Sequence, residues 1–139
     1  MSREAVDVLV LGAGFAGSLT ARLLHGIGRK VALVDRWSHP RFAIGESSTP
    51  LADMTLRTLA ERYNLPRLIP LTCYGEWKRQ YPQIGCGLKR GFSYFLHHPG
   101  ADFAAAATHC SELLVAASSS DDLADTHWLR ADVDQFLVG

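Results

Sequence analysis

Apolar positions near the start of the chain predict a strand, a helix and a second strand. Val8 to Leu11 form a continuous apolar run, which is typical of a strand covered on both faces. The next apolar residues share one face of a predicted helix, namely Ala16, Leu19, Leu23, Leu24 and Ile27. Residues 30–35 then form a second apolar run that predicts another strand. This order is typical of a parallel α/β sheet.

The turn between the first strand and the helix reads G-x-G-x-x-G. Gly12 allows a tight turn, Gly14 lets the backbone approach a pyrophosphate, and Gly17 lets the helix lie close to the strand. The N–H groups of the first helical turn then favour phosphate. We therefore expect cofactor contacts from Gly12, Ala13, Gly14, Phe15, Ala16 and Gly17. A glycine-rich turn of another α/β protein is the alternative, but the strand–turn–helix context favours dinucleotide binding.

An acidic residue, Asp35, stands at the end of the second predicted strand. A carboxylate there can accept hydrogen bonds from the adenosine ribose, which favours NAD or FAD over NADP. The next residue, Arg36, is also predicted to contact the cofactor. Residues 1–36 are therefore predicted to form a Rossmann-like βαβ unit, although the motif alone does not separate NAD from FAD.

A polar stretch rich in glycine and proline follows, over residues 37–50. Thr49 is a good N-cap and Pro50 a good first helical residue, so a helix is predicted over 51–63. Long loops in compact domains are often functional. The segment Gly45-Glu46-Ser47-Ser48 suits backbone contact with a flat or charged ligand. An ordinary surface loop before a capped helix is the alternative.

The turn motif followed by P-R-F-x-I-G-E-S-x-x-P resembles the flavin-dependent halogenases of the tryptophan-halogenase type. These belong to the glutathione-reductase-like FAD superfamily, with aromatic hydroxylases and geranylgeranyl reductases as relatives. The resemblance implies FAD as the cofactor. It also implies that residues 37–50 form a strap along the flavin, with Gly45, Glu46, Ser47 and Ser48 on the flavin side.

Residues 51–139 are predicted to form the remainder of the FAD-binding domain, with additional strands. Residues 74–87 show no clear period, whereas 87–96 predict one strand in which Lys89 shares a face with small residues. The resemblance implies that Lys89 faces the substrate chamber and is the catalytic group that captures or positions hypohalous acid. The alternative is an edge lysine that packs along its stem and keeps its charge at the surface.

Residues 112–117 predict another short strand, and the last segment predicts a helix. Its pattern R-x-x-h-D-x-h-L, where h is apolar, resembles the segment of FAD hydroxylases and halogenases whose arginine reaches the cofactor. Arg130 is therefore predicted to contact the FAD phosphate or ribose, a task suited to its planar donor fork. A surface salt bridge at the start of a helix is the alternative.

The composition of the chain limits the kinds of partner and site that it predicts. The formal net charge is zero, so nothing indicates a nucleic-acid partner, and no apolar run approaches the ~20 residues of a membrane span. The three cysteines are widely spaced, which favours reduced thiols and a cytoplasmic location over a disulfide framework. Because C-x-x-C is absent, we expect no metal site.

The resemblance covers only the N-terminal part of such a halogenase, and the W-x-W-x-I-P segment of the family is absent here. Because the chain stops inside a predicted helix, we expect an incomplete FAD-binding domain, inactive alone. The resemblance implies a flavoprotein monooxygenase that acts on an electron-rich aromatic substrate and halide through flavin hydroperoxide and hypohalous acid. A separate flavin reductase is implied as partner. An FAD hydroxylase or reductase fragment, or a non-catalytic nucleotide-binding remnant, remains open.

Overall fold

The computed structural model describes residues 5–116 and 118–139. Its helices are α1 (Phe15–Gly26), α2 (Pro50–Arg62), α3 (Tyr74–Gln80) and α4 (Arg130–Val138), with 3₁₀ helices η1 (Pro66–Thr72) and η2 (Asp121–Leu123). Its strands are β1 (Val8–Leu11), β2 (Val31–Val34), β3 (Glu46–Ser47), β4 (Cys86–Lys89), β5 (Gly91–Phe95), β6 (Glu112–Ala116) and β7 (Asp125–Trp128).

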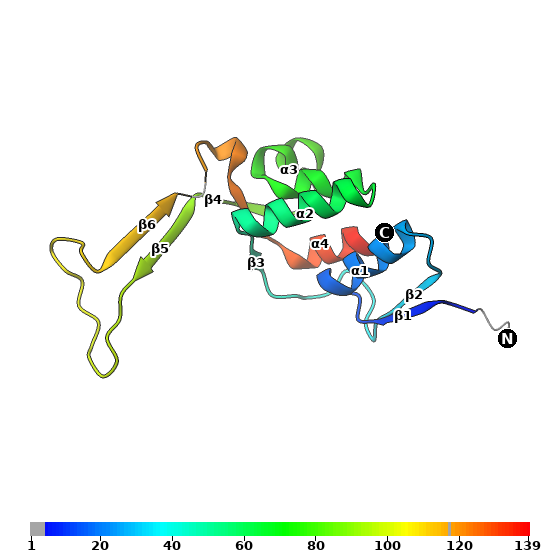
Figure 1. Cartoon of the computed structure of the whole chain (residues 1–139), viewed down its shortest axis with the longest axis horizontal. Coiled ribbons are helices and arrows are strands. Elements are labelled where there is room, and N and C mark those ends of the chain that lie inside the picture. The colour runs from blue at the N-terminus through cyan, green and yellow to red at the C-terminus, as the bar shows by residue number, and fades with distance from the viewer. Residues whose placement is uncertain (1–4, 117) are drawn as a thin grey trace.

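The first three elements form a βαβ unit, as the apolar pattern predicts. β1 and β2 pair in parallel, with Val8 opposite Val31 and Leu11 opposite Val34. The helix α1 connects them, and Figure 1 shows it lying beside this pair of strands. The backbone N–H of Gly12 donates to the Val34 carbonyl at 2.7 Å, so the glycine turn begins directly at the carboxyl ends of β1 and β2.

A second, antiparallel sheet has the order β3-β7-β4. It joins the strap to the C-terminal part of the chain, because Glu46 of β3 pairs with Trp128 of β7. Sequence reasoning placed no strand at 125–128, since this segment is only four residues long and mixes polar and apolar side chains. It likewise found no period in residues 74–80, which form the two-turn helix α3.

The single strand predicted over 87–96 is wrong, because the chain breaks at Arg90. β4 ends at Lys89 and pairs with β7, whereas β5 begins at Gly91 and pairs with β6. The Arg90 guanidinium forms two 2.9 Å hydrogen bonds to the Asp121 carboxylate. An unbroken alternation would put this charge among apolar side chains, and the break lets it face solvent instead.

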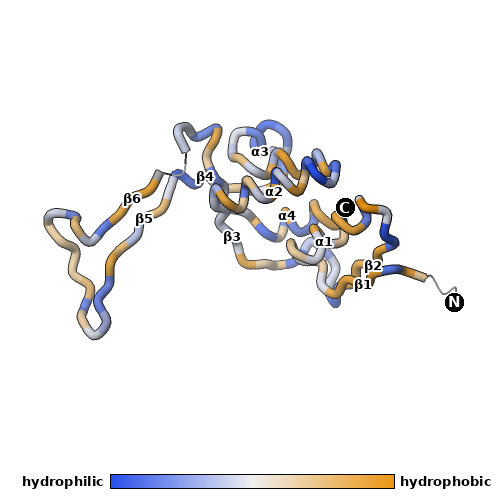
Figure 2. Tube along the Cα trace, viewed as in Figure 1, coloured by the Kyte–Doolittle hydropathy of each residue, from blue (hydrophilic) through white to orange (hydrophobic). Residues whose placement is uncertain are grey.

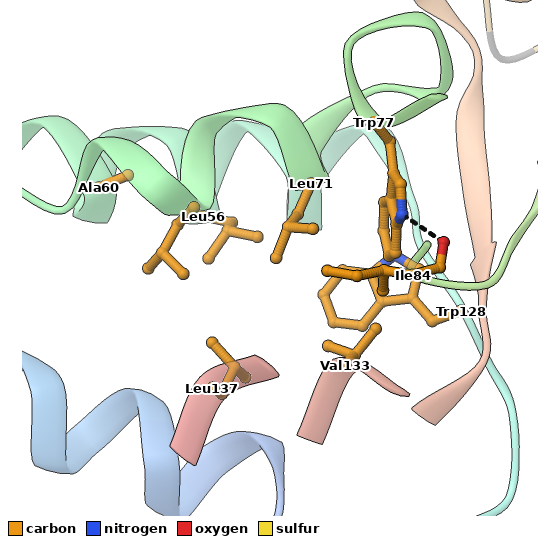
Figure 3. Close-up of a cluster of buried hydrophobic side chains, with 9 residues drawn as sticks. Leu56, Ala60, Leu71, Trp77, Ile84, Trp128, Val133 and Leu137 are labelled. Atoms are coloured by element: carbon orange, nitrogen blue, oxygen red, sulfur yellow. Dashed lines mark hydrogen bonds between the residues drawn. The ribbon is translucent and has the colours of Figure 1, made fainter. Parts of the chain in front are cut away.

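The core lies where α2, η1, α3 and α4 meet the second sheet (Figure 3). Its centre contains two tryptophans: the Trp77 and Trp128 rings pack edge to face at a centroid distance of 5.9 Å. The Trp77 indole N–H donates to the Ile84 carbonyl at 3.0 Å, so the buried donor is satisfied. Burial of each such side chain contributes roughly 1.5–3 kcal/mol of stability.

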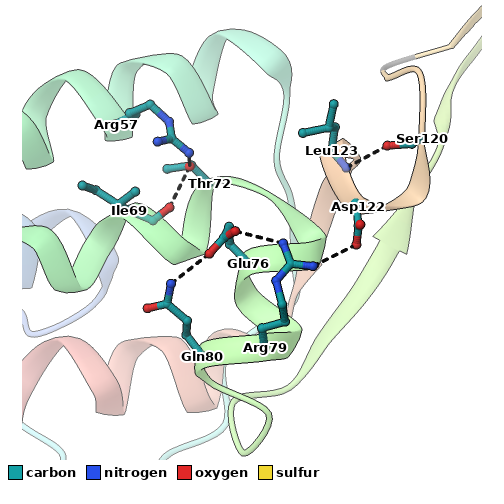
Figure 4. Close-up of polar contacts among 9 residues, drawn as sticks. All are labelled: Arg57, Ile69, Thr72, Glu76, Arg79, Gln80, Ser120, Asp122 and Leu123. Atoms are coloured by element: carbon teal, nitrogen blue, oxygen red, sulfur yellow. Dashed lines mark hydrogen bonds and ion pairs between the residues drawn. The ribbon is translucent and has the colours of Figure 1, made fainter.

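A surface network fixes α3 against the turn that leads into β7 (Figure 4). Arg79 bridges Glu76 at 2.9 Å and Asp122 at 3.2 Å. Gln80 donates to the second oxygen of Glu76 at 2.8 Å. Exposed ion pairs contribute about 0–1 kcal/mol each, so this network orients the turn more than it stabilises the fold.

The β5–β6 hairpin projects away from the helices (Figure 1). Its strands carry a large share of apolar residues, visible as the orange stretches of Figure 2. Leu114 is 76% exposed and Tyr94 is 54% exposed. The strand predicted over 112–117 is present as β6 over 112–116, and residue 117 lies outside the described residues.

Candidate functional site

The glycine turn has the backbone geometry that a close ligand approach requires. Gly12 has a φ of +103°, a conformation that favours glycine. A Cβ atom on Gly17 would overlap the Gly12 carbonyl oxygen, so only glycine fits there. Gly14 is the N-cap of α1, which has no side-chain cap and no acidic residue in its first turn. No residue of the first turn therefore neutralises the positive end of the helix, although Asp134 Oδ2 would lie 3.9 Å from a Cβ atom built on Gly14.

Asp35 braces this turn from the end of β2. One carboxylate oxygen accepts from the Ala13 N–H at 2.6 Å, and the other accepts from the Trp37 N–H at 2.9 Å. The bond from Ala13, followed by that from Trp37, lowers the pKa of Asp35. Because a carboxylate offers about four acceptor positions, the side chain keeps capacity for a ribose hydroxyl.

Two arginines reach the turn at Gly14. Their Nη2 atoms would lie 3.6 Å (Arg41) and 3.7 Å (Arg130) from a Cβ built on Gly14. Arg41 comes from the strap, and its buried Nε has no hydrogen-bond partner among the described residues. Sequence reasoning included Arg130 in the candidate site but omitted Arg41, although Arg41 belongs to the P-R-F pattern that carries the family resemblance.

The Arg130 side chain is held rigidly from two directions. It donates to both oxygens of Asp134, at 2.8 and 3.1 Å, and to Glu46 at 3.0 Å. Asp134 is fully buried, and the Arg130 side chain is only 16% exposed. The position of this guanidinium is therefore set in the absence of any ligand. Arg130 begins α4 and pairs with the exposed Glu46 as well as with the buried Asp134, so the salt-bridge alternative is met in part and the contact with FAD stays a prediction.

Two open depressions flank the turn. A cleft of about 990 Å³ is lined by Leu11, Gly12, Val34, Asp35, Arg36, Trp37, Ser38, Pro40, Arg41 and Phe42. A groove of about 450 Å³ between α1 and α2 contains five predicted contacts in its lining, namely Phe15, Glu46, Ser47, Ser48 and Arg130. Ala13 is buried beneath the turn, whereas Ala16 and Gly45 are exposed and line neither depression.

The strap residues do not all face the same way. Glu46 and Ser47 are exposed, whereas Ser48 is buried. The Ser48 hydroxyl donates to Asp53 at 3.0 Å and accepts from the Thr126 N–H at 2.9 Å. The Ser48 side chain is thus turned toward the interior, and the prediction that Gly45–Ser48 lie on the flavin side stays a prediction.

Lys89 lies inside the molecule, at 4% exposure, rather than at a surface edge. Its ammonium group donates to the Ser48 carbonyl and stands 3.6 Å from the centre of the Phe92 ring. Burial lowers the pKa of Lys89, and the nearby carboxyls of Asp125 and Asp53 act in the opposite direction. The surface alternative is thus wrong, while the proposed contact with hypohalous acid stays a prediction.

Sequence reasoning missed the two carboxyls near Lys89. Asp53 was interpreted only as an acidic residue in the first turn of a helix, and Asp125 was not singled out. Asp125 lies opposite Lys89 in the β4–β7 pairing, and both carboxyls are buried. A pairing between strands 36 residues apart leaves no local signal in the sequence, so no pattern could reveal this cluster.

Within residues 5–116 and 118–139, no three His, Cys, Asp or Glu side chains gather as metal ligands would. The cysteines Cys73, Cys86 and Cys110 are free thiols. Among the helices that the structure describes, none is both long and apolar enough to cross a membrane.

Residues 7–136 match the model of the FAD-dependent oxidoreductase family. The chain is 34% identical over 135 residues to monodechloroaminopyrrolnitrin halogenase PrnC of Pseudomonas fluorescens, covering 95% of this chain and 22% of that protein. It is 29% identical over 96 residues to tetracycline 7-halogenase of Kitasatospora aureofaciens, covering 69% and 17%. The crystal structure of halogenase PltM with phloroglucinol and FAD has a TM-score of 0.75 at 31% identity, covering 96% and 25%.

These similarities confirm the predicted α/β fold as that of the N-terminal, FAD-binding region of halogenases. The chain spans about a quarter or less of the length of each of these relatives.

Proposed function

Because this chain belongs to the family of FAD-dependent oxidoreductases and its relatives are flavin-dependent halogenases, we propose that it supplies the FAD site of such a halogenase. One observation carries the proposal. The guanidinium groups of Arg41 and Arg130 converge on Gly14, at the free N-terminus of α1. Such an arrangement of cations and N–H groups is suited to the diphosphate of FAD.

The residues present fit this cofactor. The turn is open at Gly12, where a Cβ would meet nothing within 4 Å. The buried Nε of Arg41 has no hydrogen-bond partner within the described residues, so it is a donor that an anion could satisfy, while Nη2 of the same side chain lies 3.7 Å from Asp35. In this proposal the diphosphate lies on the turn, Asp35 accepts from the adenosine ribose, and Arg36 lines the adenine side of the cleft.

Reduced FAD, when bound, would donate two electrons to oxygen, and the activated oxygen would then oxidise halide to hypohalous acid. This chain would bind and orient FAD and would exclude water from it. Lys89 would hold hypohalous acid through its ammonium hydrogens and direct it toward an electron-rich aromatic substrate. Only one acceptor, the Ser48 carbonyl, is bonded to its ammonium in the described residues, so two N–H bonds stay available.

Fluorescence titration of the chain with FAD, NAD and NADP tests the cofactor. We expect FAD to bind, NAD to bind more weakly and NADP to bind weakest, because Asp35 would repel a 2′-phosphate. If NADP bound as tightly as FAD, or if FAD did not bind to the folded chain, the proposed site would be wrong.

The substitution Lys89→Met tests the chemistry in the protein that carries this chain. Halide, a flavin reductase and an electron-rich aromatic substrate are supplied, and the product is analysed by mass spectrometry. We expect halogenation to be lost and FAD affinity to be kept, while Lys78→Met, at an exposed lysine, changes neither. Halogenation by Lys89→Met would exclude the proposed role, and hydroxylation without halogenation by the wild type would favour an FAD hydroxylase.

A further inference from the structure

Two carboxyl groups meet behind the strap, away from the glycine turn. Asp53 comes from the first turn of α2 and is 7% exposed, and Asp125 begins β7 and is 4% exposed. One hydroxyl links the two, because Ser48 Oγ donates to Asp53 at 3.0 Å and accepts from the N–H of Thr126, the residue after Asp125, at 2.9 Å. Buried carboxylates this close cannot both be ionised without strong mutual repulsion.

The hydrogen bonds around the pair show where a proton is needed. One oxygen of Asp53 accepts from the Ser48 hydroxyl at 3.0 Å. The other oxygen of Asp53, Oδ1, and Oδ2 of Asp125 are buried without any partner within the described residues. A carboxyl O–H donating to a carboxylate would satisfy both oxygens at once.

The charge of Lys89 completes the cluster. Lys89 lies opposite Asp125 in the β4–β7 register. Within the described residues, its ammonium is the charged group outside the pair that affects the pKa of either carboxyl. Two ionised carboxylates would give this buried cluster an excess negative charge. A pair that holds one proton carries a single negative charge, which balances the ammonium.

We propose that Asp53 and Asp125 share one proton and act together as positioning residues for Lys89 and for the strap. The pair holds the Ser48 hydroxyl, while the carbonyl of the same residue accepts from Lys89. The strap and Lys89 are therefore held in place by the same buried group of side chains. The shared proton follows from the cluster itself, whereas its importance for catalysis rests on the proposed function.

Electrostatics agree with this geometry. Burial, with a smaller contribution from Asp125, raises the pKa of Asp53 to about 7. Burial also raises the pKa of Asp125. The two groups titrate as one unit, so the pair retains a proton up to about neutral pH.

The direct test is a carboxyl ¹³C NMR titration of the 139-residue chain with labelled aspartate. We expect one proton to leave the Asp53–Asp125 pair only near pH 7. If both buried carboxyls ionised below about pH 5, the shared proton would be excluded. This measurement uses no FAD, so its outcome is independent of whether the proposed cofactor binds.

Asparagine variants test the positioning role through the ¹³Cε titration of Lys89. In Asp53→Asn the amide can donate to Asp125 as the carboxyl O–H would, so the Lys89 midpoint should move little. In the double variant Asp53→Asn/Asp125→Asn the counter-charge is gone, and the midpoint should fall by about one pH unit or more. Asp102→Asn is the matched control. An unchanged Lys89 midpoint in the double variant would overturn the proposal.

Discussion

The glycine turn, residues 12–17, and the Lys89 cluster, which is Lys89 with Ser48, Asp53 and Asp125, are built in opposite ways. The turn is one contiguous segment whose N–H groups are approached by the guanidinium groups of Arg41 and Arg130, and each guanidinium is paired with a carboxylate. The cluster collects Ser48, Asp53, Lys89 and Asp125 from separate elements into a buried group of nearly balanced charge. In the proposed function the first region receives the diphosphate of FAD, whereas the second region holds the ammonium group of Lys89 in place.

Because the two regions are built from different residues, we expect that FAD affinity and the proposed role of Lys89 can be changed separately. The strap connects the two regions, because Arg41 and Glu46 approach the turn while Ser48 belongs to the cluster. A substitution in one region should therefore leave the other largely intact. Four predictions test this separation, in order of decreasing effect.

The largest effect is expected from Gly17→Ala. Its methyl group would overlap the Gly12 carbonyl oxygen, so the turn must distort, and the free energy of unfolding should fall by about 3 kcal/mol or more. Gly14→Ala is the matched control, because its methyl group meets only ordinary contacts, of 3.6 Å and longer. That variant should fold normally but bind FAD more weakly. Urea denaturation measures the free energy of unfolding of the two variants, and equal values would contradict the overlap expected at Gly17.

The next effect is expected from Lys89→Met, measured as stability. The substitution leaves the Ser48 carbonyl and the carboxyl pair without their cation, which should lower the free energy of unfolding by about 1–3 kcal/mol. FAD affinity should change by less than about twofold. Lys78→Met, at an exposed position, should change neither quantity. A large loss of FAD affinity in Lys89→Met would show that the two regions are not separable.

A smaller effect, on affinity, is expected from Arg130→Gln. Loss of a charge-assisted hydrogen bond to the diphosphate should weaken FAD binding by roughly tenfold, or about 1.4 kcal/mol. Arg90→Gln removes a guanidinium from the exposed Asp121 pair and should leave the affinity unchanged. Isothermal calorimetry distinguishes the two. Equal affinities of the two variants would remove Arg130 from the cofactor site.

The smallest effect is a pH dependence of stability. Because the pKa of Asp53 is raised to about 7 in the folded chain, its contribution is fully present at low pH and is lost as pH rises. The free energy of unfolding should fall by about 1 kcal/mol between pH 6 and pH 8 through this group. Asp53→Asn should flatten this slope, and Asp102→Asn should keep it. A slope that survives Asp53→Asn must come from other groups.

The same two regions explain what the sequence could predict. The βαβ unit, the helix over 51–63 and the halogenase resemblance follow from local patterns, and the structure and the comparisons confirm them. The break at Arg90 did not follow, because a local alternation does not show that Asp121 draws the guanidinium away. The partners of Lys89 did not follow either, because strand pairing brings Asp125 to it from 36 residues away.

Amide NMR mapping of FAD binding tests the central claim most directly. FAD is added to the ¹⁵N-labelled chain, and the shifts of backbone and arginine side-chain N–H signals are followed. We expect the largest changes on residues 12–17, Arg41 and Arg130, and little change in the Lys89 cluster and the β5–β6 hairpin. Largest shifts on the hairpin, or no shifts on the glycine turn at saturating FAD, would contradict this expectation.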